Sequence, residues 1–324
     1  MNILFIGGTG VISRACTQAC LERGDKVFLL NRGESPNAIP PECHHFQADI
    51  QQVEHVNALM KDHHFDCVVD WIAYTPAHIE RESALFRGKT DQYIFISSAS
   101  IYAKPPRLPI QETHPIHNPY WEYAHNKILC EQTLQRMDDE EAFPFTIVRP
   151  SHTYDATKIP LRGGVTSLQR LLTGKPVIVH GDGTTLWTLT HHRDFAQGFV
   201  GLLGHPEALG QTYHITSDEV LTWNQIYHIM AQTAGVEAHL FHLASETILQ
   251  YDKEWGDGLL GDKAHNMVFD NSKIKQLNPS YEAQIPFAQG AREILDWYQS
   301  DSSHQRIDLN LDTLMDQIIR DRTG

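Results

Sequence analysis

A tyrosine and a lysine four residues apart form a pair that could move a proton. Tyr123 and Lys127 lie in segment 121–137, whose apolar periodicity predicts a helix, so both side chains project from the same helix face. A tyrosine hydroxyl has an ordinary pKa of about 10, and a neighbouring ammonium group lowers this pKa because it favours the phenolate. We therefore expect acid–base chemistry on a small-molecule substrate, with the pKa of Tyr123 lowered by Lys127.

Two serines follow a predicted buried strand that precedes this helix. Residues 93–96 form the apolar run, and Ser97 and Ser98 come next, at the carboxyl end of the strand. Ligands of open parallel sheets bind at that end, so Ser98 is expected to hydrogen-bond the oxygen atom of Tyr123. On its own, the Tyr-x-x-x-Lys spacing is more often a surface pair, and its position after this strand is what favours catalysis.

A glycine-rich turn at the start of the chain predicts a dinucleotide site. The apolar strand 2–6 runs into a Gly-Gly-Thr-Gly turn, and a helical pattern follows it. A bound pyrophosphate needs close backbone approach at the glycines and unpaired N–H groups at the helix start. Ser13 replaces the third glycine of the usual spacing, and the alternative is a tight turn in an ordinary α/β protein. The residues expected to contact the cofactor here are Gly7, Thr9, Gly10, Val11 and Ile12.

The elements that position these residues alternate between strand and helix. Predicted strands occupy 2–6, 26–30, 65–70, 93–98 and 145–149. This rhythm indicates an α/β fold with a doubly wound parallel sheet of the Rossmann type. We expect a dinucleotide-binding domain over 1–150, to which 182–216 returns, and a smaller mixed substrate-binding region over 151–181 and 217–324. Residues 102–119 contain five prolines and are expected to form a long, irregular loop.

The composition suits a globular protein and disfavours several functions. The chain has 324 residues, of which 41% are hydrophobic, and its net charge of −14 disfavours binding to nucleic-acid phosphates. No apolar run reaches the ~18 residues of a membrane span, and no leader segment is recognisable, so we expect a cytoplasmic protein without a membrane partner. The five cysteines lack paired metal spacing, which fits a reducing compartment. The twenty histidines are scattered, so we expect surface or capping roles for most of them and no metal site.

These features together resemble the extended short-chain dehydrogenase/reductases, in particular the NAD-dependent epimerase/dehydratase branch. The resemblance covers nearly the whole chain. It rests on GGTGVIS at 7–13, Asp49-Ile50, FISSASIYA at 95–103, residues 111–127, Val148-Arg149-Pro150 with Tyr154, Gly181-Asp182-Gly183 and residues 190–194. It implies an NAD(P)-dependent oxidoreductase or epimerase that transfers hydride at a hydroxyl or carbonyl of a sugar or sugar nucleotide.

The resemblance also assigns roles to individual residues. Ser98, Tyr123 and Lys127 align with the catalytic residues, and Lys127 also aligns with the lysine that holds the nicotinamide ribose. The remaining cofactor contacts that it implies are Asp49 and Ile50, which bracket the adenine, together with Ala73 and Pro150.

Two departures concern the cofactor and the substrate. Asn31 stands where NAD-preferring members usually carry an acidic ribose ligand, and Arg32 follows it, which favours NADP over NAD unless Arg32 only points to solvent. Trp187 and Leu259-Leu260 stand where nucleotide-sugar enzymes often carry arginines. Because bidentate arginine is well suited to phosphate, these changes weaken the expectation of a diphosphate sugar. The candidates to replace those arginines are Arg162, Arg170, Lys263 and His265.

Two other function classes stay open. The segments 30–33 and 263–274 are also similar to chloroplast stem-loop RNA-binding relatives. The alternative function is therefore a catalytically retired dinucleotide-binding protein that acts as an RNA-binding or redox-sensing regulator. The intact Ser98, Tyr123 and Lys127 favour the enzyme, and the acidic net charge disfavours RNA.

A homodimer is a further implication of the resemblance. It would form through segments 75–86 and 121–137, packed as a four-helix bundle. The apolar residues Ile128, Leu129 and Leu134 fit either that interface or packing within the chain.

Overall fold

A parallel sheet lies at the centre of the computed structural model, which describes residues 1–323. Within that range its seven strands are, from one edge to the other, β11 (Gln211–Ile215), β6 (Phe145–Pro150), β5 (Tyr93–Ile96), β4 (Cys67–Asp70), β1 (Asn2–Ile6), β2 (Lys26–Asn31) and β3 (His44–Gln47). Every neighbouring pair is parallel. The strand order reverses between β1 and β4, where a doubly wound sheet forms its ligand crevice. The predicted fold class is confirmed.

Helices cover both faces of the sheet, which is why its inner strands read as continuous apolar runs. On one face, Ile3 and Phe5 share a core with Cys16 and Phe199. On the other face, Leu4 shares a core with residues of three further helices. The helices of the first face are α1 (Val11–Glu22) and α6 (His192–Val200), and those of the second are α2 (Val53–Leu59), α3 (Pro76–Phe86) and α4 (Glu122–Glu141).

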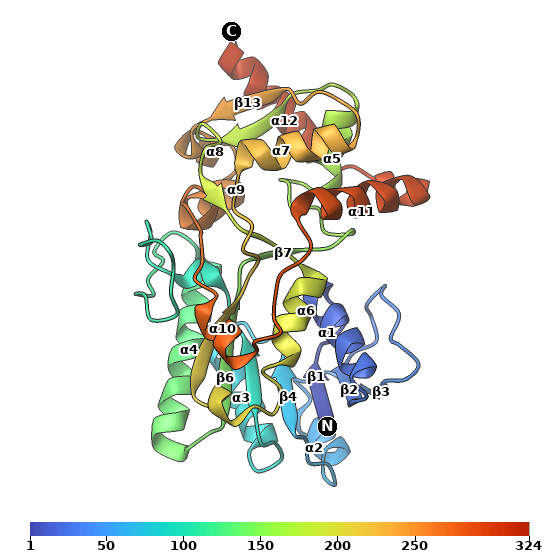
Figure 1. The fold of residues 1–324 in the computed structure, drawn as a ribbon, viewed down its shortest axis with the longest axis vertical. Coiled ribbons are helices and arrows are strands. Elements are labelled where there is room, and N and C mark those ends of the chain that lie inside the picture. Colours follow the sequence, from blue (N-terminus) through green and yellow to red (C-terminus); the bar gives the residue numbers. More distant parts are fainter. Residues whose placement is uncertain (324) are drawn as a thin grey trace.

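A smaller body stands over the carboxyl ends of the strands (Figure 1). Two-stranded sheets pair β7 (His152–Tyr154) with β10 (Leu189–His191), β9 (Leu186–Trp187) with β12 (Leu221–Thr222), and β8 (Val177–His180) with β13 (Leu240–Leu243). The helices of this part are α5 (Val165–Leu172), α7 (Trp223–Thr233), α8 (Ser245–Tyr251), α9 (Lys253–Gly258), α11 (Phe287–Ser300) and α12 (Leu309–Thr323). A second core around Leu168, Trp223 and Phe287 holds it together, and α10 (Ser272–Leu277) returns to pack beside β11.

The segment 102–119 is irregular, as its prolines predict, and a buried arginine ties it to the sheet. Arg149 in β6 donates to the Tyr102 hydroxyl and to the Glu112 carbonyl oxygen, both at 2.8 Å. The same guanidinium makes two hydrogen bonds, of 3.0 and 2.6 Å, to the carboxylate of Glu131 in α4. This charge-assisted pair fixes the loop next to the helix that carries Tyr123.

The strand β3 was not predicted from the sequence. Its residues are mostly exposed polar side chains at the edge of the sheet, with only Phe46 half-buried, so they show no apolar run. The strands β7, β9, β10 and β12 of the smaller body were missed for a related reason, since strands of two or three residues have too little periodicity to be recognised.

The apolar residues of α4 pack within the chain. Leu134 belongs to the core between the sheet and α4, and Ile128 is also buried. Of the two interpretations left open by the sequence, packing within the chain therefore accounts for these two residues. At the outer surface, α3 and α4 are joined by an ion pair of 3.1 Å between Glu80 and Arg136.

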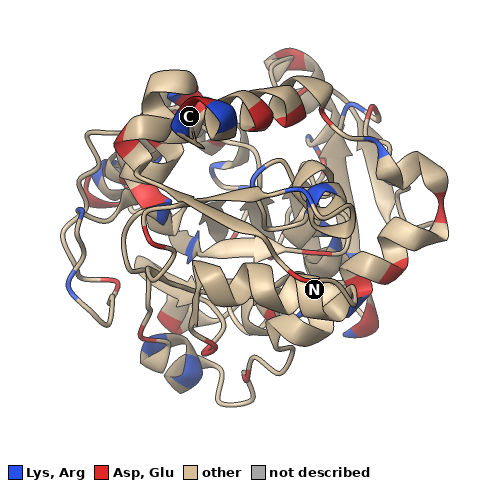
Figure 2. Ribbon diagram, turned by 90° about the horizontal axis from the view of Figure 1, so that it is seen from above, with Lys and Arg blue, Asp and Glu red and all other residues tan. Residues whose placement is uncertain are grey.

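Charged residues of both signs are interspersed along the ribbon (Figure 2). None of the helices within residues 1–323 combines the length and the apolar character that crossing a membrane would require.

Candidate active site

The glycine-rich turn joins β1 to α1 at the reversal point of the sheet. Gly7 and Gly8 have φ values of 101° and 86°, and a Cβ atom on Gly8 would come within 2.6 Å of Leu29. At Gly10, by contrast, a Cβ atom would meet only the Ser13 hydroxyl, at 3.4 Å. Ser13 accepts a hydrogen bond of 2.8 Å from the Gly10 N–H, so the residue that replaces the third glycine caps the first turn of α1.

Two cavities extend from this turn along the carboxyl ends of the strands. One, of about 310 Å³, reaches Ser98, Tyr123 and Lys127. The other, of about 560 Å³, reaches the end of β2 and Asp49. They share Gly7, Thr9 and Ile72, so the two halves meet at the start of α1. Two cavities that join at a helix N-terminus fit a ligand with two ends and a central pyrophosphate.

Most of the residues predicted to contact the cofactor line these cavities: Gly7, Thr9, Gly10, Ile12, Asn31, Arg32, Asp49, Ile50, Lys127 and Pro150. Val11 and Ala73 border neither cavity, and Ala73 is buried. Ile72 was missed, although it is apolar and 49% exposed inside the cleft. Its position just after the apolar run of β4 could have indicated it, because Ser98 was predicted from its position just after the apolar run of β5.

Tyr123 is held between two aromatic rings. It stacks on Tyr74 with ring centres 5.8 Å apart and contacts Trp121 with centres 4.9 Å apart. Burial raises the pKa of Tyr123, and the nearby Ser98 hydroxyl, which lies 2.9 Å from the Ser100 hydroxyl, opposes that rise. Ser98 and Tyr123 border the same two cavities, and a hydrogen bond between their oxygens stays a prediction. Tyr74 and Trp121 were not recognised from the sequence as neighbours of Tyr123.

Two backbone carbonyl oxygens hold the ammonium group of Lys127. Nζ donates to Ala73 at 2.7 Å and to Ile96 at 2.8 Å, and it lies 6.0 Å from the centre of the Tyr123 ring. In the polypeptide itself the pKa of Tyr123 is therefore raised, in contrast to the lowering that its spacing from Lys127 led us to expect. The burial of the hydroxyl has the larger effect, and the ammonium group is engaged elsewhere.

A buried carboxylate supports the segment that holds Lys127. Asp70 ends β4 and accepts hydrogen bonds from the N–H groups of Ile72 and Ala73 at 2.9 and 2.8 Å, and from the Tyr93 hydroxyl at 2.6 Å. Burial lowers the pKa of Lys127, and the charge of Asp70 is the largest opposing influence. Asp70 therefore acts as the counter-charge of a buried lysine that it does not touch.

Arg32, at the end of β2, borders the larger cavity and is paired with a carboxylate. The Asn31 amide donates to the Gly7 carbonyl oxygen and its oxygen accepts from the Gly33 N–H, both at 2.9 Å. Arg32 is exposed and forms an ion pair of 3.1 Å with the exposed Glu34. Asn31 thus shapes the turn, and Arg32 is the residue there that could meet a phosphate.

A second pair of cavities lies on the other side of Tyr123. The nearer one, of about 310 Å³, is bordered by Ser98, Tyr123, His152 and Trp187. The farther one, of about 250 Å³, extends into the smaller body. The residues common to both are Trp121, His152, Lys158 and Lys263. A substrate that reacts at Tyr123 could therefore extend into the smaller body.

Only two of the four cations suggested for phosphate binding border these cavities. Lys263 borders both, and Arg162 borders the farther one but pairs with Asp252 at 2.8 Å. Arg170 is buried under α12, where its guanidinium pairs with Asp316 at 2.8 Å, and the ring of His265 bonds the Leu260 carbonyl oxygen at 2.9 Å. Trp187 and Leu259, two of the residues that stand in place of the expected arginines, line these cavities.

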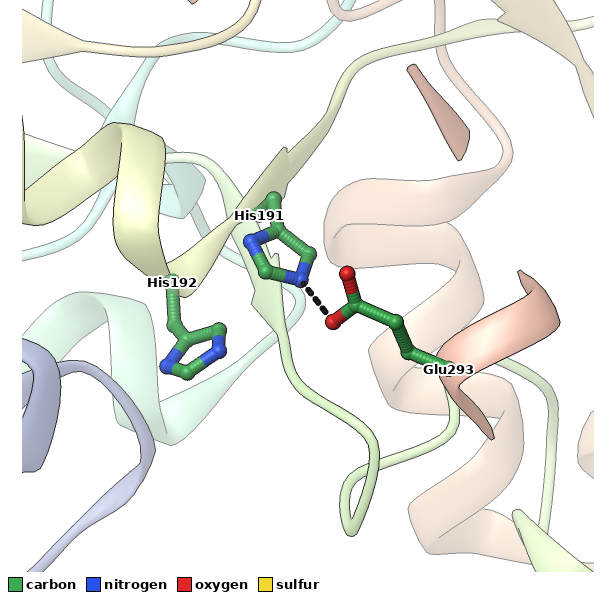
Figure 3. Close-up of side chains that lie close together, drawn as sticks. All are labelled: His191, His192 and Glu293. Carbon is green, nitrogen blue, oxygen red and sulfur yellow. Dashed lines mark hydrogen bonds and ion pairs between the residues drawn. The ribbon is translucent and has the colours of Figure 1, made fainter. Parts of the chain in front are cut away.

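His191, His192 and Glu293 lie close together at the start of α6 (Figure 3). Nδ1 of His191 accepts from the Arg193 N–H at 3.3 Å, so its Nε2 carries the proton that is donated to Glu293 at 3.1 Å. Glu293 also forms an ion pair with Arg193. A cation would have to displace both contacts, and these bonds show that His191 caps α6, in line with the predicted capping role of histidines.

Comparison with known proteins places this site in a family. A chloroplast stem-loop binding protein of 41 kDa from Arabidopsis thaliana is 26% identical over 250 residues, which cover 72% of this chain and 63% of that protein, so the chain spans less than two thirds of that relative. A 2′-dehydrokanamycin reductase from Streptomyces kanamyceticus is 22% identical over 286 residues, covering 87% of this chain and 80% of that one.

A solved structure supports the same fold assignment. The UDP-glucuronic acid 4-epimerase of Bacillus cereus, determined with UDP-glucuronic acid and NAD, superposes with a TM-score of 0.75 at 18% identity, covering 92% of this chain and 98% of that chain. The sequence model of the NAD dependent epimerase/dehydratase family matches residues 3–216, which include the glycine turn, Ser98, Tyr123 and Lys127. The chain therefore belongs to the NAD dependent epimerase/dehydratase family.

Proposed function

We propose that the protein is an NAD(P)-dependent oxidoreductase or epimerase that acts on a hydroxyl or carbonyl group of a sugar or sugar nucleotide. The observation that carries this proposal is the position of Tyr123, which borders the cofactor cavity on one side and the substrate cavity on the other. A group between two cavities can exchange a proton with a substrate in one while a cofactor occupies the other.

Each of the three side chains has a distinct role in the proposal. Tyr123 takes or gives the proton of the reacting hydroxyl, and Ser98 hydrogen-bonds the same oxygen. Lys127 contributes positive charge beside the cofactor cavity and contacts the ribose. The dinucleotide, when bound, supplies the hydride acceptor or donor. Tyr123 is half-buried and Lys127 is buried, and this partial removal from water strengthens each of these electrostatic interactions.

NADP is the proposed cofactor, with NAD as the alternative. Arg32 supports NADP because it borders the larger cavity, and because the last residue of β2 is Asn31 and not an acidic residue. The NAD bound to the Bacillus cereus epimerase supports the alternative, and the ion pair of Arg32 with Glu34 weakens the attraction for a phosphate.

Further parts of the proposal concern organisation and surroundings. Residues 1–150 with α6 and β11 of the segment 182–216 would bind the dinucleotide. Residues 151–181 and 217–324 would bind the substrate together with Trp187, which borders the substrate cavity. We place the protein in the cytoplasm, since its five cysteines are free thiols. A homodimer through α3 and α4 is also proposed, and light scattering of the purified chain at several concentrations would decide it.

A second candidate function is a regulator without turnover. The 26% identity to a chloroplast stem-loop binding protein favours it, because a protein named for stem-loop binding is similar in sequence to this chain. The net charge of −14 and the retained Tyr123 and Lys127 speak against it.

Calorimetric titration of the purified protein with NAD⁺ and NADP⁺ tests the basis of both functions. Saturable binding of either dinucleotide is expected, followed by a change in nicotinamide absorbance on incubation with a panel of sugars and nucleotide sugars. Binding of neither dinucleotide would contradict the proposal. Binding without turnover on any substrate, together with micromolar affinity for a stem-loop RNA, would favour the regulator.

A further inference from the structure

The cavity farther from Tyr123 has aromatic and apolar walls. It is bordered by Trp121, Ile178, Trp223, Tyr227, Trp255 and Leu259. Most of these residues come from α7, α9 and the strand β8 of the smaller body (Figure 1). Its volume of about 250 Å³ suits one ring system.

Two of the cationic side chains around this cavity already have partners. Arg162 pairs with Asp252 at 2.8 Å and its guanidinium lies 5.0 Å from the centre of the Trp255 ring. The Lys263 ammonium lies 5.6 Å from the centre of the Trp121 ring and 5.9 Å from that of Trp187. Lys158 and Glu254 are exposed and carry opposite charges. The cavity therefore favours a neutral occupant.

A neutral hydrogen-bond donor lies where the two substrate cavities meet. The indole N–H of Trp187 donates to Nδ1 of His152 at 3.1 Å, and since an indole can only donate, Nδ1 must be unprotonated. Burial and the charges of Lys263 and Lys158 lower the pKa of His152 to about 3, so the ring is neutral and its proton is on Nε2. Within residues 1–323, this Nε2–H group has no hydrogen-bond partner, and the ring borders both cavities.

We propose that the farther cavity binds a neutral ring of the substrate, stacked against the tryptophans, and that His152 donates a hydrogen bond to the atom that links this ring to the reacting sugar. The substrate class is then a glycoside whose second ring is aromatic or is another sugar with an apolar face. The inference rests on the proposed function, because it takes Tyr123 as the place of reaction.

The passage between the cavities is poorly matched to a diphosphate. Two adjacent negative charges are best held by bidentate arginines or several charged donors. The polar side chains shared by both cavities are the neutral His152, the exposed Lys158, and Lys263, whose ammonium lies over the Trp121 ring. A neutral glycosidic link needs only one donor, which His152 supplies.

Calorimetric titrations of the purified protein saturated with dinucleotide test this inference. The probes are 4-nitrophenyl β-D-glucopyranoside for an aromatic ring, cellobiose for a second sugar ring, and UDP-glucose for a nucleoside diphosphate. We expect one of the two neutral glycosides to bind about tenfold more tightly than UDP-glucose. Tighter binding of UDP-glucose, or no binding of either glycoside, would overturn the inference.

A variant that fills the cavity gives an independent test. Gly258 borders the cavity, has a helical φ of −67°, and a Cβ atom on it would meet no atom within 4 Å. Gly258→Leu should weaken glycoside binding about tenfold or more, whereas Gly258→Ala, with the same loss of backbone freedom, should bind nearly as well as the parent. His152→Leu should also weaken glycoside binding, by loss of the donor.

The dinucleotide affinity of these variants separates this inference from the proposed function. All three should bind the dinucleotide as the parent does, since the farther cavity does not border the cofactor cleft. Glycoside binding that Gly258→Leu leaves at parental strength would contradict the ring site alone. If the parent protein itself did not bind the dinucleotide, the proposed function would be contradicted instead.

Discussion

Asp70 and Lys127 are joined through one residue. The Ala73 N–H donates to Asp70 at 2.8 Å, and the Ala73 carbonyl oxygen accepts from the Lys127 ammonium at 2.7 Å. The carboxylate thus fixes the peptide that holds the lysine, and its charge opposes the lowering of the pKa of Lys127 by burial. This relationship makes the charge state of the site depend on a residue outside both cavities.

Asp70→Asn should move the alkaline limb of the activity profile to lower pH. The amide oxygen can still accept from Ile72 and Ala73, but the negative charge is lost, so the pKa of Lys127 falls and its ammonium is lost at lower pH. The measurement is kcat/KM against pH for the parent and the variant, with thermal unfolding as the control for folding. An alkaline limb that stays in place would show that Asp70 has only a structural role.

Gly10→Asp should abolish dinucleotide binding without unfolding the protein. The site has an extended φ of −82° and only Ser13 nearby, and aspartate is a favourable residue before the first turn of a helix. Its carboxylate, however, would repel the pyrophosphate at the start of α1. Calorimetry and circular dichroism check the two halves of this prediction, and retained affinity would refute the assignment of the turn. Gly8→Ala is the contrasting variant, because its Cβ atom would collide with Leu29 and destabilise the fold.

Arg32 and Glu34 should change the cofactor preference in opposite directions. Arg32→Gln is expected to weaken NADP⁺ binding about tenfold and to leave NAD⁺ binding nearly unchanged, because only NADP⁺ carries the 2′-phosphate. Glu34→Gln should strengthen NADP⁺ binding, since it frees the guanidinium from its 3.1 Å ion pair. A parent protein that prefers NAD⁺ by about a hundredfold would defeat the interpretation of Arg32.

The protein should lose stability as the pH falls below about 6.5. Burial lowers the pKa of His152 and His214 to about 3 and that of His180 to about 4, whereas an unfolded chain titrates these groups at about 6.5. The unfolded state then binds more protons, so each histidine removes about 1.4 kcal/mol per pH unit between its two pKa values. Urea unfolding at pH 7.5, 6 and 5 measures the slope. His214→Gln should reduce the slope by about one proton, and an unchanged slope in that variant would contradict the assignment.

Local pattern was sufficient to find the parts of the site that follow directly from strands and helices. Gly7, Gly10 and Ser98 come right after apolar strands, and Tyr123 and Lys127 share a helix face. Their position after these strands, together with the family resemblance, placed them at the crevice. The central strands could be predicted for the same reason, because both of their faces are buried.

Tertiary contacts account for what the sequence did not reveal. Asp70 and Trp121 gain their roles only when β4, α4 and the smaller body come together, and no periodicity marks them. The tautomer of His152 depends on Trp187, which is distant in sequence. The direction of the pKa shift of Tyr123 was also beyond the sequence, because it depends on how deeply the hydroxyl is buried.

The central claim is that Tyr123 moves the proton, and removal of its hydroxyl tests it most directly. Once a substrate is found, Tyr123→Phe should lower kcat about a hundredfold or more and leave dinucleotide affinity unchanged. Lys127→Met is the matched variant, and it should lose both activity and dinucleotide affinity, because Lys127 borders the cofactor cavity. Near-parental turnover by Tyr123→Phe would contradict the proposed role of Tyr123 and would show that another residue is the acid–base group.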